Sequence, residues 1–237
     1  MESLEYLPQL KTLNELSTIC KDFPKGFLTF EKFKTTVLIP GNYYHVFNHA
    51  NGTENLFTEP KNYFFFLEKT SLYILPFVKL HAYCLLPNHF HFLVYVKDLE
   101  ELKILSIFRN YQNLSEENFQ MLVEKKVSKS FSNLFSCYSQ SFNKIYGRKG
   151  SLFIPNMKQI SINTTNDICK IVHYIHSNPV HHGFVKRIED WKFSSYKTYL
   201  SDSDTKLARN EIIEIFGSRK YLIEYHQQPI ELKLNWD

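Results

Sequence analysis

Two adjoining strand-like runs constrain the fold of this 237-residue chain more than any other part of its sequence. Residues 78–85 and 90–96 are rich in β-branched and aromatic side chains, and a short Leu-Pro-Asn segment at 86–88 separates them. This pattern predicts two antiparallel strands joined as a hairpin. Apolar side chains occupy every second position of the second run and so share one face of the strand: Phe90, Phe92, Val94 and Val96.

The remaining elements place the hairpin at the centre of a larger sheet. Further strands are predicted at 43–48 and within 151–162, and helices at 61–75, 99–127 with a break at 113–115, 129–146 and 167–177, the last ended by Asn178-Pro179. The order is strand, helix, strand, strand, helix, strand, helix. It predicts an α+β fold of the ferredoxin-like kind, an antiparallel sheet with helices packed on one face.

Three segments are expected along the chain: an N-terminal helical extension at 1–35, a central domain at 36–200, and a C-terminal helical tail at 201–237. Hydrophobic residues make up 43% of the sequence, enough to build a core and to exclude wholesale disorder. The four cysteines are scattered and form no C-x-x-C pair, which indicates free thiols. The start of the chain lacks the pattern of a signal peptide, and no apolar run is long enough for a membrane span. These features predict a soluble, cytoplasmic protein with no membrane partner.

Charge is distributed unevenly along the chain. Residues 138–200 carry 9 Lys and Arg against 3 Asp and Glu, whereas 1–137 carry 14 of each and 201–237 carry 5 against 7. A basic segment that also contains tyrosine and phenylalanine is typical of a nucleic-acid-binding surface, although most such imbalances are solvated faces. The best phosphate-contact candidates are Lys144, Arg148, Lys149 and Lys158.

The sharpest chemical feature is a His-x-His pair on the second strand of the hairpin. His89 and His91 alternate with Phe90 and Phe92, so both imidazoles lie on the face opposite the apolar one. Side chains two residues apart on a strand are separated by roughly 6.6 Å and can converge on one cation. Imidazole is a common ligand of divalent metals. The alternative is two polar histidines on a half-exposed strand, which is the commoner reading of an isolated pair.

The second feature is Tyr138. It lies on the apolar stripe of the 129–146 helix, a position typical of a core aromatic residue, but polar residues and the basic run at 144–149 surround it in the sequence. A phenol has a pKa of about 10 and attacks poorly unless phenolate character is stabilised.

Four segments together resemble the HUH single-tyrosine transposases, and in particular the REP-associated tyrosine transposases. They are YYHVFNHA, YCLLPNHFHFLV, YSQSFNKIYGRKGSLF and YIHSNPVHHGFVKRIEDWKFSSY. They occur in the order that the family shows, and the resemblance extends from about residue 41 to residue 199. The chain departs from the family pattern at Asn48-His49-Ala50, where relatives commonly have Asn-Arg-Gly.

The resemblance implies a specific chemistry. The sheet would be ferredoxin-like or RRM-like, and His89 and His91 would hold Mg²⁺ or Mn²⁺, with Asn143 as the nearest candidate for a third ligand. Tyr138 would attack a phosphodiester in single-stranded DNA, at a site flanked by a hairpin, leaving a 5′-phosphotyrosine and a free 3′-OH. That 3′-OH can reverse the reaction at another DNA end, which makes the enzyme a strand transferase. The resemblance leaves open a monomer or a homodimer in which the tyrosine acts on the partner's histidines.

Two other functions compete with the transposase-like endonuclease. One is a non-catalytic or domesticated nucleic-acid-binding module on the same fold. The other is a hydrolase that uses a metal-bound water without the tyrosine. A covalent protein–DNA adduct distinguishes the first function from both.

Overall fold

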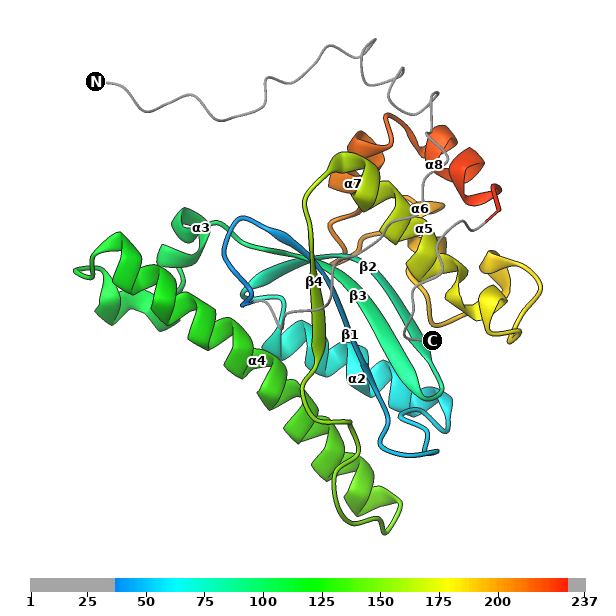
Figure 1. Ribbon diagram of the computed structural model, residues 1–237, viewed down its shortest axis with the longest axis horizontal. Helices are drawn as coiled ribbons and strands as arrows, with labels where there is room; N and C mark the ends of the chain where they lie inside the picture. The colour runs from blue at the N-terminus through cyan, green and yellow to red at the C-terminus, as the bar shows by residue number, and fades with distance from the viewer. Residues whose placement is uncertain (1–36, 230–237) are drawn as a thin grey trace.

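The computed structural model describes residues 37–229, and these residues form a four-stranded antiparallel sheet with helices on both faces (Figure 1). The predicted extension at 1–35 and residues 230–237 of the predicted tail lie outside the described residues. The strands are β1 (Tyr43–His49), β2 (Val78–Leu86), β3 (His89–Val96) and β4 (Lys158–Ile162). The helices are α2 (Pro60–Tyr73), α3 (Leu99–Lys103), α4 (Glu116–Ile145), α5 (Thr165–His181), α6 (Tyr196–Tyr199), α7 (Arg209–Ile215) and α8 (Arg219–His226), with 3-10 helices at Ser106–Tyr111 and Ile188–Asp190.

The sheet has the strand order β2-β3-β1-β4, and every neighbouring pair is antiparallel. The connections β1-α2-β2 and β3-α4-β4 each join parallel strands that are not neighbours. The first connection passes from β1 over β3 to β2, and the second passes the other way across the sheet, from β3 over β1 to β4. Strands β3 and β4 also point opposite to β1 and β2. Two right-handed crossovers of this kind place both helices on the same face. The predicted ferredoxin-like α+β fold is confirmed, but helices were expected on one face only, and α5 also covers the second face.

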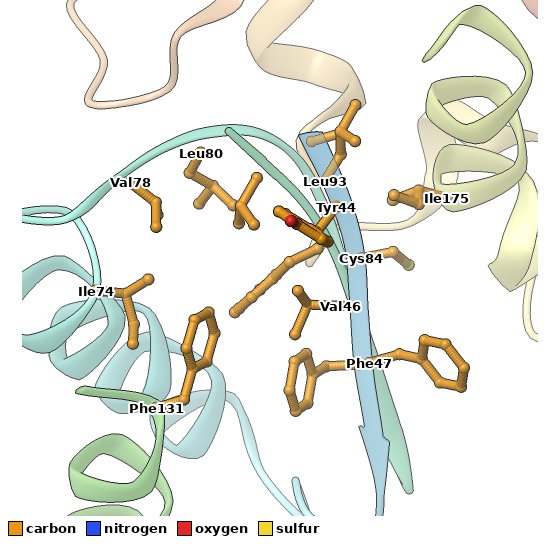
Figure 2. Close-up of a cluster of buried hydrophobic side chains, with 14 of the residues drawn as sticks. Tyr44, Val46, Phe47, Ile74, Val78, Leu80, Cys84, Leu93, Phe131 and Ile175 are labelled. Carbon is orange, nitrogen blue, oxygen red and sulfur yellow. The ribbon is translucent and has the colours of Figure 1, made fainter. Parts of the chain in front are cut away.

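Helices α2 and α4 cover the apolar face of the sheet, and the main core lies between them. Phe66 of α2 is fully buried and its ring lies near the rings of Phe90, Phe92 and Tyr138, with centroids 5.2, 6.1 and 5.0 Å away. Figure 2 shows Ile74 and Phe131 on the side of β1 toward which Val46 points. The alternation of Phe90 and Phe92 on β3 therefore buries the predicted apolar face as expected.

Helix α5 covers the opposite face and packs on β2 and β3. Figure 2 shows Ile175 of this helix on the side of the sheet where Phe47 and Cys84 lie. The helix runs from Thr165 to His181 and passes through Pro179, whereas the sequence predicted its end at Asn178-Pro179. Pro179 has no amide hydrogen to donate to the carbonyl oxygen four residues earlier, yet the helix continues two residues past it, and Gly183 with a φ of 72° follows.

The long helix α4 differs from the prediction in its extent. Ser115 caps its N-terminus by accepting a hydrogen bond from the amide of Asn118, which confirms the predicted break at 113–115. From there one continuous helix of 30 residues replaces the separate helix predicted at 129–146. The strand predicted within 151–162 is shorter, since only Lys158–Ile162 pair with β1, and Phe153 forms an isolated bridge to Ala50.

The described part of the C-terminal tail is helical, as predicted, and packs on the free edge of β2. The amide of Ala208 donates to the carbonyl oxygen of Leu80 at 2.8 Å, and the amide of Ser195 donates to that of Tyr83 at 2.9 Å. Backbone of the 193–208 segment thus covers an edge that would otherwise be open to pairing with another chain. No helix in the described part of the chain is long and apolar enough to cross a membrane.

Three buried histidines, His173, His176 and His226, form a cluster between α5 and α8, here called the α5–α8 histidine cluster. Nδ1 of His226 donates to the carbonyl oxygen of Leu222, so its Nε2 accepts a hydrogen bond from Nδ1 of His176 at 2.8 Å. Nε2 of His176 in turn accepts from the hydroxyl of Ser195 at 2.8 Å. Burial lowers the pKa of His226 to about 3 and that of His173 to about 4. All three rings are therefore neutral in the folded protein at pH 7.

We expect this cluster to make the fold sensitive to acid. The unfolded chain takes up protons below pH 6.5 while the buried rings stay neutral, so the free energy of unfolding falls as the pH falls from 6.5 toward 3. The expected slope is about 1.4 kcal/mol per pH unit for each such histidine. Urea unfolding of wild type and His226→Gln between pH 7 and pH 5 measures this slope. The free energy of unfolding of the variant should fall by about 1.4 kcal/mol less per pH unit than that of wild type. Equal slopes would contradict the assignment, and His181→Gln, at an exposed position, is the matched control.

Candidate functional site

The pairing of β1 with β3 gathers four histidines on the face that α5 covers. His91 lies opposite Phe47 and His89 lies opposite His49 in the antiparallel register, and His45 occupies the next position of β1 on the same face. The strand alternation that buries Phe90 and Phe92 on one side thus assembles the imidazoles on the other. His182, just after the end of α5, joins these four. We call the five residues the sheet histidine cluster: His45, His49, His89, His91 and His182.

The rings of the sheet histidine cluster contact one another closely. Nε2 of His45 lies 2.9 Å from Nδ1 of His91. The rings of His49 and His89 are stacked with centroids 4.6 Å apart, and the ring of His182 lies 5.0 Å from that of His89. His89 is also held by a 2.8 Å hydrogen bond between its Nδ1 and the side-chain oxygen of Asn88, at the hairpin turn.

Burial keeps the two predicted metal ligands neutral. His89 is 2% exposed and His91 is fully buried. Burial lowers the pKa of His89 to about 3, helped by the nearby His49 and His182, and holds the pKa of His91 well below its usual range. The Nε2 atoms of both rings are buried and make no close hydrogen bond in the described residues, although the Asn178 side chain lies near enough to His89 to raise its pKa against the effect of burial. A neutral imidazole with an unpartnered nitrogen is the form that binds a metal ion.

The donor set is nevertheless incomplete for a metal ion held by protein side chains alone. Residues 37–229 contain no group of three or more His, Cys, Asp or Glu side chains arranged to hold a metal. Mg²⁺ and Mn²⁺ favour oxygen ligands over imidazole. His89 and His91 therefore fit as a partial site, in which the remaining ligands would be oxygens from water or from a bound phosphate.

Tyr138 does not lie with these histidines, which corrects the predicted arrangement. It belongs to α4, on the other side of the sheet, and is 1% exposed among Phe57, Phe66 and Phe153. Its hydroxyl donates to the carbonyl oxygen of Leu56 at 2.5 Å, and burial raises its pKa far above the usual value. The position of Tyr138 on the apolar stripe of its helix correctly indicated a core residue, because α4 is a crossover helix that packs on the apolar face of the sheet.

A different tyrosine, which the sequence analysis missed, contacts the histidines. Tyr174 of α5 meets the rings of His91 and His45 edge-on, with centroids 5.6 and 5.9 Å apart and interplanar angles of 83° and 80°. Its sequence context, YIHSNPV, was one of the four segments that carried the resemblance. The order of elements could have indicated this contact. Helix α5 follows the last strand and is not a crossover helix, so it can cover the face of the sheet that α2 and α4 leave open.

Asn143 and Arg148 are engaged in the loop after α4. The amide nitrogen of Asn143 donates to the carbonyl oxygen of Gly150 at 2.9 Å, and its oxygen accepts from Arg148 at 2.9 Å. Arg148 also donates to the carbonyl oxygen of Ser151 at 2.8 Å and forms an ion pair with Glu54. The structure does not bring Asn143 to the histidines as a third ligand, and it uses Arg148 to fasten this loop.

The three predicted lysine contacts are exposed, as a phosphate-binding residue must be. Lys144 and Lys149 lie at the end of α4 and in the loop that follows it. Lys158 lies opposite Phe47 in the pairing of β1 with β4 and therefore faces the same side of the sheet as the histidines. Of the predicted basic residues, Lys158 is the one that the register places on the histidine face.

Comparison with known proteins supports the resemblance drawn from the motifs. No protein-family model matches the chain. The chain is 35% identical over 66 residues to the REP-associated tyrosine transposase of Escherichia coli (strain K12), a match that covers 28% of this chain and 39% of that protein. A solved structure of a REP-associated tyrosine transposase bound to a REP hairpin matches 73% of this chain and 87% of its own, with a TM-score of 0.48 and 19% identity. The sequence similarity to a REP-associated tyrosine transposase is thus confirmed, over less than half the length of that relative.

Proposed function

We propose that this chain is a transposase-like DNA-cleaving enzyme that acts on single-stranded DNA, with Tyr174 as its nucleophile. The observation that carries the proposal is the contact of the Tyr174 ring with His91 and His45, on the same face as the His89–His91 pair. A tyrosine beside a pair of metal-binding imidazoles is the arrangement that the transposase resemblance requires. The sequence similarity to a REP-associated tyrosine transposase supports DNA as the substrate. The hairpin beside the cleaved strand is part of the proposal.

The proposed reaction exchanges one phosphodiester for another. The phenolic oxygen of Tyr174 forms a bond to phosphorus as the bond from phosphorus to the 3′ oxygen breaks. The phenol loses its proton and the departing 3′ oxygen gains one, which leaves a 5′-phosphotyrosine and a free 3′-OH. Because a phosphoester bond is kept in the intermediate, the 3′-OH of another DNA end can reverse the step without an external energy source.

His89 and His91 would bind Mg²⁺ or Mn²⁺ through their buried Nε2 atoms. A bound divalent ion supplies charge neutralisation at the phosphate oxygens. Lys158, exposed on the same face of the sheet, would contact a neighbouring phosphate. Because Tyr174 contacts the histidines of its own chain, the proposal requires no second subunit.

Access to the site sets a further requirement. Tyr174 is 2% exposed and His91 is fully buried under α5, whereas His49 and His182 are only half-buried. The strand would therefore approach from the side of His49 and His182, and α5 would have to shift from the sheet for the phosphate to reach Tyr174. This burial is also what favours the second candidate function, a nucleic-acid-binding module that does not cleave.

Removing divalent metal separates these functions. We expect EDTA to abolish the covalent adduct with a single-stranded oligonucleotide that carries a hairpin, because the scissile phosphate loses its charge partner, while DNA binding in a gel-shift assay persists. Excess Mn²⁺ should restore the adduct, and His89→Ala should behave like EDTA. An adduct that forms at full yield in EDTA would disprove the metal requirement. Cleavage without an adduct would instead support a water nucleophile.

A further inference from the structure

An exposed aromatic side chain lies beside the sheet histidine cluster. Phe184, three residues past the end of α5, is 45% exposed, and its ring centroid lies 6.4 Å from that of His182. The ring of His182 in turn lies 5.0 Å from that of His89. Phe184 is therefore on the side of the site from which the DNA strand would approach.

Both the backbone and the ring of Phe184 are held in place. Its amide donates to the carbonyl oxygen of Pro179 at 2.9 Å, after a turn at Gly183. Its ring centroid lies 5.5 Å from that of Trp191, and the indole N–H of Trp191 donates to the carbonyl oxygen of Leu85, on β2, at 3.0 Å. The exposed ring is thus preorganised, so little conformational entropy is lost when a flat ligand stacks on it.

Positively charged side chains follow both of these aromatic residues in the chain. Lys186 comes two residues after Phe184 and Lys192 directly follows Trp191, and both lysines are exposed. The two carboxylates between the lysines form ion pairs with the guanidinium of Arg187. Exposed aromatic surface with lysines beside it is the combination that binds unpaired nucleic-acid strands, because bases stack on the ring and phosphates are attracted to the cations.

We propose that Phe184 stacks on one unpaired base of the DNA strand, close to the phosphate that Tyr174 attacks. This assignment rests on the proposed function for the identity of the strand as DNA, and it adds a contact that holds the strand at the site. Stacking uses the flat face of a base and not its hydrogen-bonding edge, so Phe184 contributes affinity and position with little preference among bases. Because its amide is bonded to the last turn of α5, Phe184 would move together with Tyr174 when that helix shifts from the sheet.

A double-mutant cycle between protein and DNA tests the stacking. The probe is a hairpin oligonucleotide with a single-stranded flank, bound by the full chain in EDTA so that no cleavage occurs, and fluorescence anisotropy measures its Kd. In a series of further probes, an abasic site replaces each nucleotide of the flank in turn. At one position the abasic site should weaken binding to wild type by roughly 5- to 100-fold, the range for one stacked base. Phe184→Ala should weaken binding of the intact probe to a similar extent and should lose no further affinity when the abasic site is at that position.

Three further variants are controls. Phe184→Trp keeps an aromatic face and should bind the intact probe at least as tightly as wild type. Phe184→Leu keeps apolar volume without that face and should bind it more weakly. Tyr111→Ala removes an exposed aromatic ring near α3, on the opposite side of the molecule in Figure 1, and should leave the affinity unchanged.

Unchanged affinity of Phe184→Ala for the intact probe would overturn the stacking and leave the exposed ring to a protein partner. Wild-type affinity in Phe184→Leu, or a loss in Phe184→Ala that is the same with every abasic probe, would overturn it as well. The binding measurement needs no cleavage, so it is independent of the proposed reaction. One abasic position coupled to Phe184 in a protein that forms no covalent adduct would leave the stacking standing and refute the proposed function. An adduct without such coupling would do the reverse.

Discussion

Replacing Tyr174 with phenylalanine is expected to abolish the covalent protein–DNA adduct, with a loss in cleavage rate of about 10³-fold or more. The substitution removes only the hydroxyl, and the ring keeps its edge-on contacts with His45 and His91. The fold should therefore be retained while the nucleophile is lost. The measurement uses a labelled hairpin oligonucleotide with Mn²⁺, and a denaturing gel reads the adduct.

Tyr138→Phe is the matched control for this experiment. It removes the hydrogen bond to the carbonyl oxygen of Leu56, which should lower the free energy of unfolding by about 1 kcal/mol. It should leave adduct formation unchanged. The two variants together decide between the tyrosine chosen from the sequence and the one found beside the histidines. If Tyr174→Phe kept full adduct formation and Tyr138→Phe lost it, the assignment made from the tertiary structure would be refuted.

Phe66→Ala is expected to cause the largest loss of stability, lowering the free energy of unfolding by about 3–5 kcal/mol. The Phe66 side chain is fully buried where α2, α4 and β3 meet, and its ring lies near those of Phe57, Phe90 and Tyr138. Truncation removes apolar contacts from three elements at once and leaves a cavity that close-packed aromatic neighbours cannot fill. Urea unfolding followed by circular dichroism measures the change.

Phe64→Ala on the same helix is the control for this prediction. The Phe64 side chain is 64% exposed and meets Phe193 only at the edge, with ring centroids 5.9 Å apart. Its truncation should cost less than about 1 kcal/mol. Equal losses in the two variants would show that the core is not centred on Phe66.

The central sheet could be predicted from the sequence because its indications are local. Alternation along 90–96 places the aromatic residues on one face and His89 and His91 on the other, whatever the rest of the chain does. The order of elements then restricts the topology to a ferredoxin-like sheet. The extent of α4 and the passage of α5 through Pro179 were missed, since helix ends depend on packing against neighbours as well as on local breakers.

The candidate site could be predicted only in part. The histidine pair follows from strand alternation. The contacts of the basic side chains and of Asn143 could not be predicted, because their partners lie elsewhere in the chain or depend on the fold. Arg148 finds Glu54, 94 positions earlier in the chain, and with Asn143 it fastens the loop after α4. The exposure of Lys158 on the histidine face likewise depends on the register of β4 against β1.

By itself, the sequence determined that two imidazoles share a strand face opposite an apolar one, that the sheet is antiparallel, and that the chain resembles a transposase. Only the tertiary structure decided which tyrosine meets those imidazoles. The physical reason is the handedness of chain crossovers. It directs α2 and α4, and Tyr138 with them, to the apolar face and leaves the histidine face to α5, the helix that carries Tyr174.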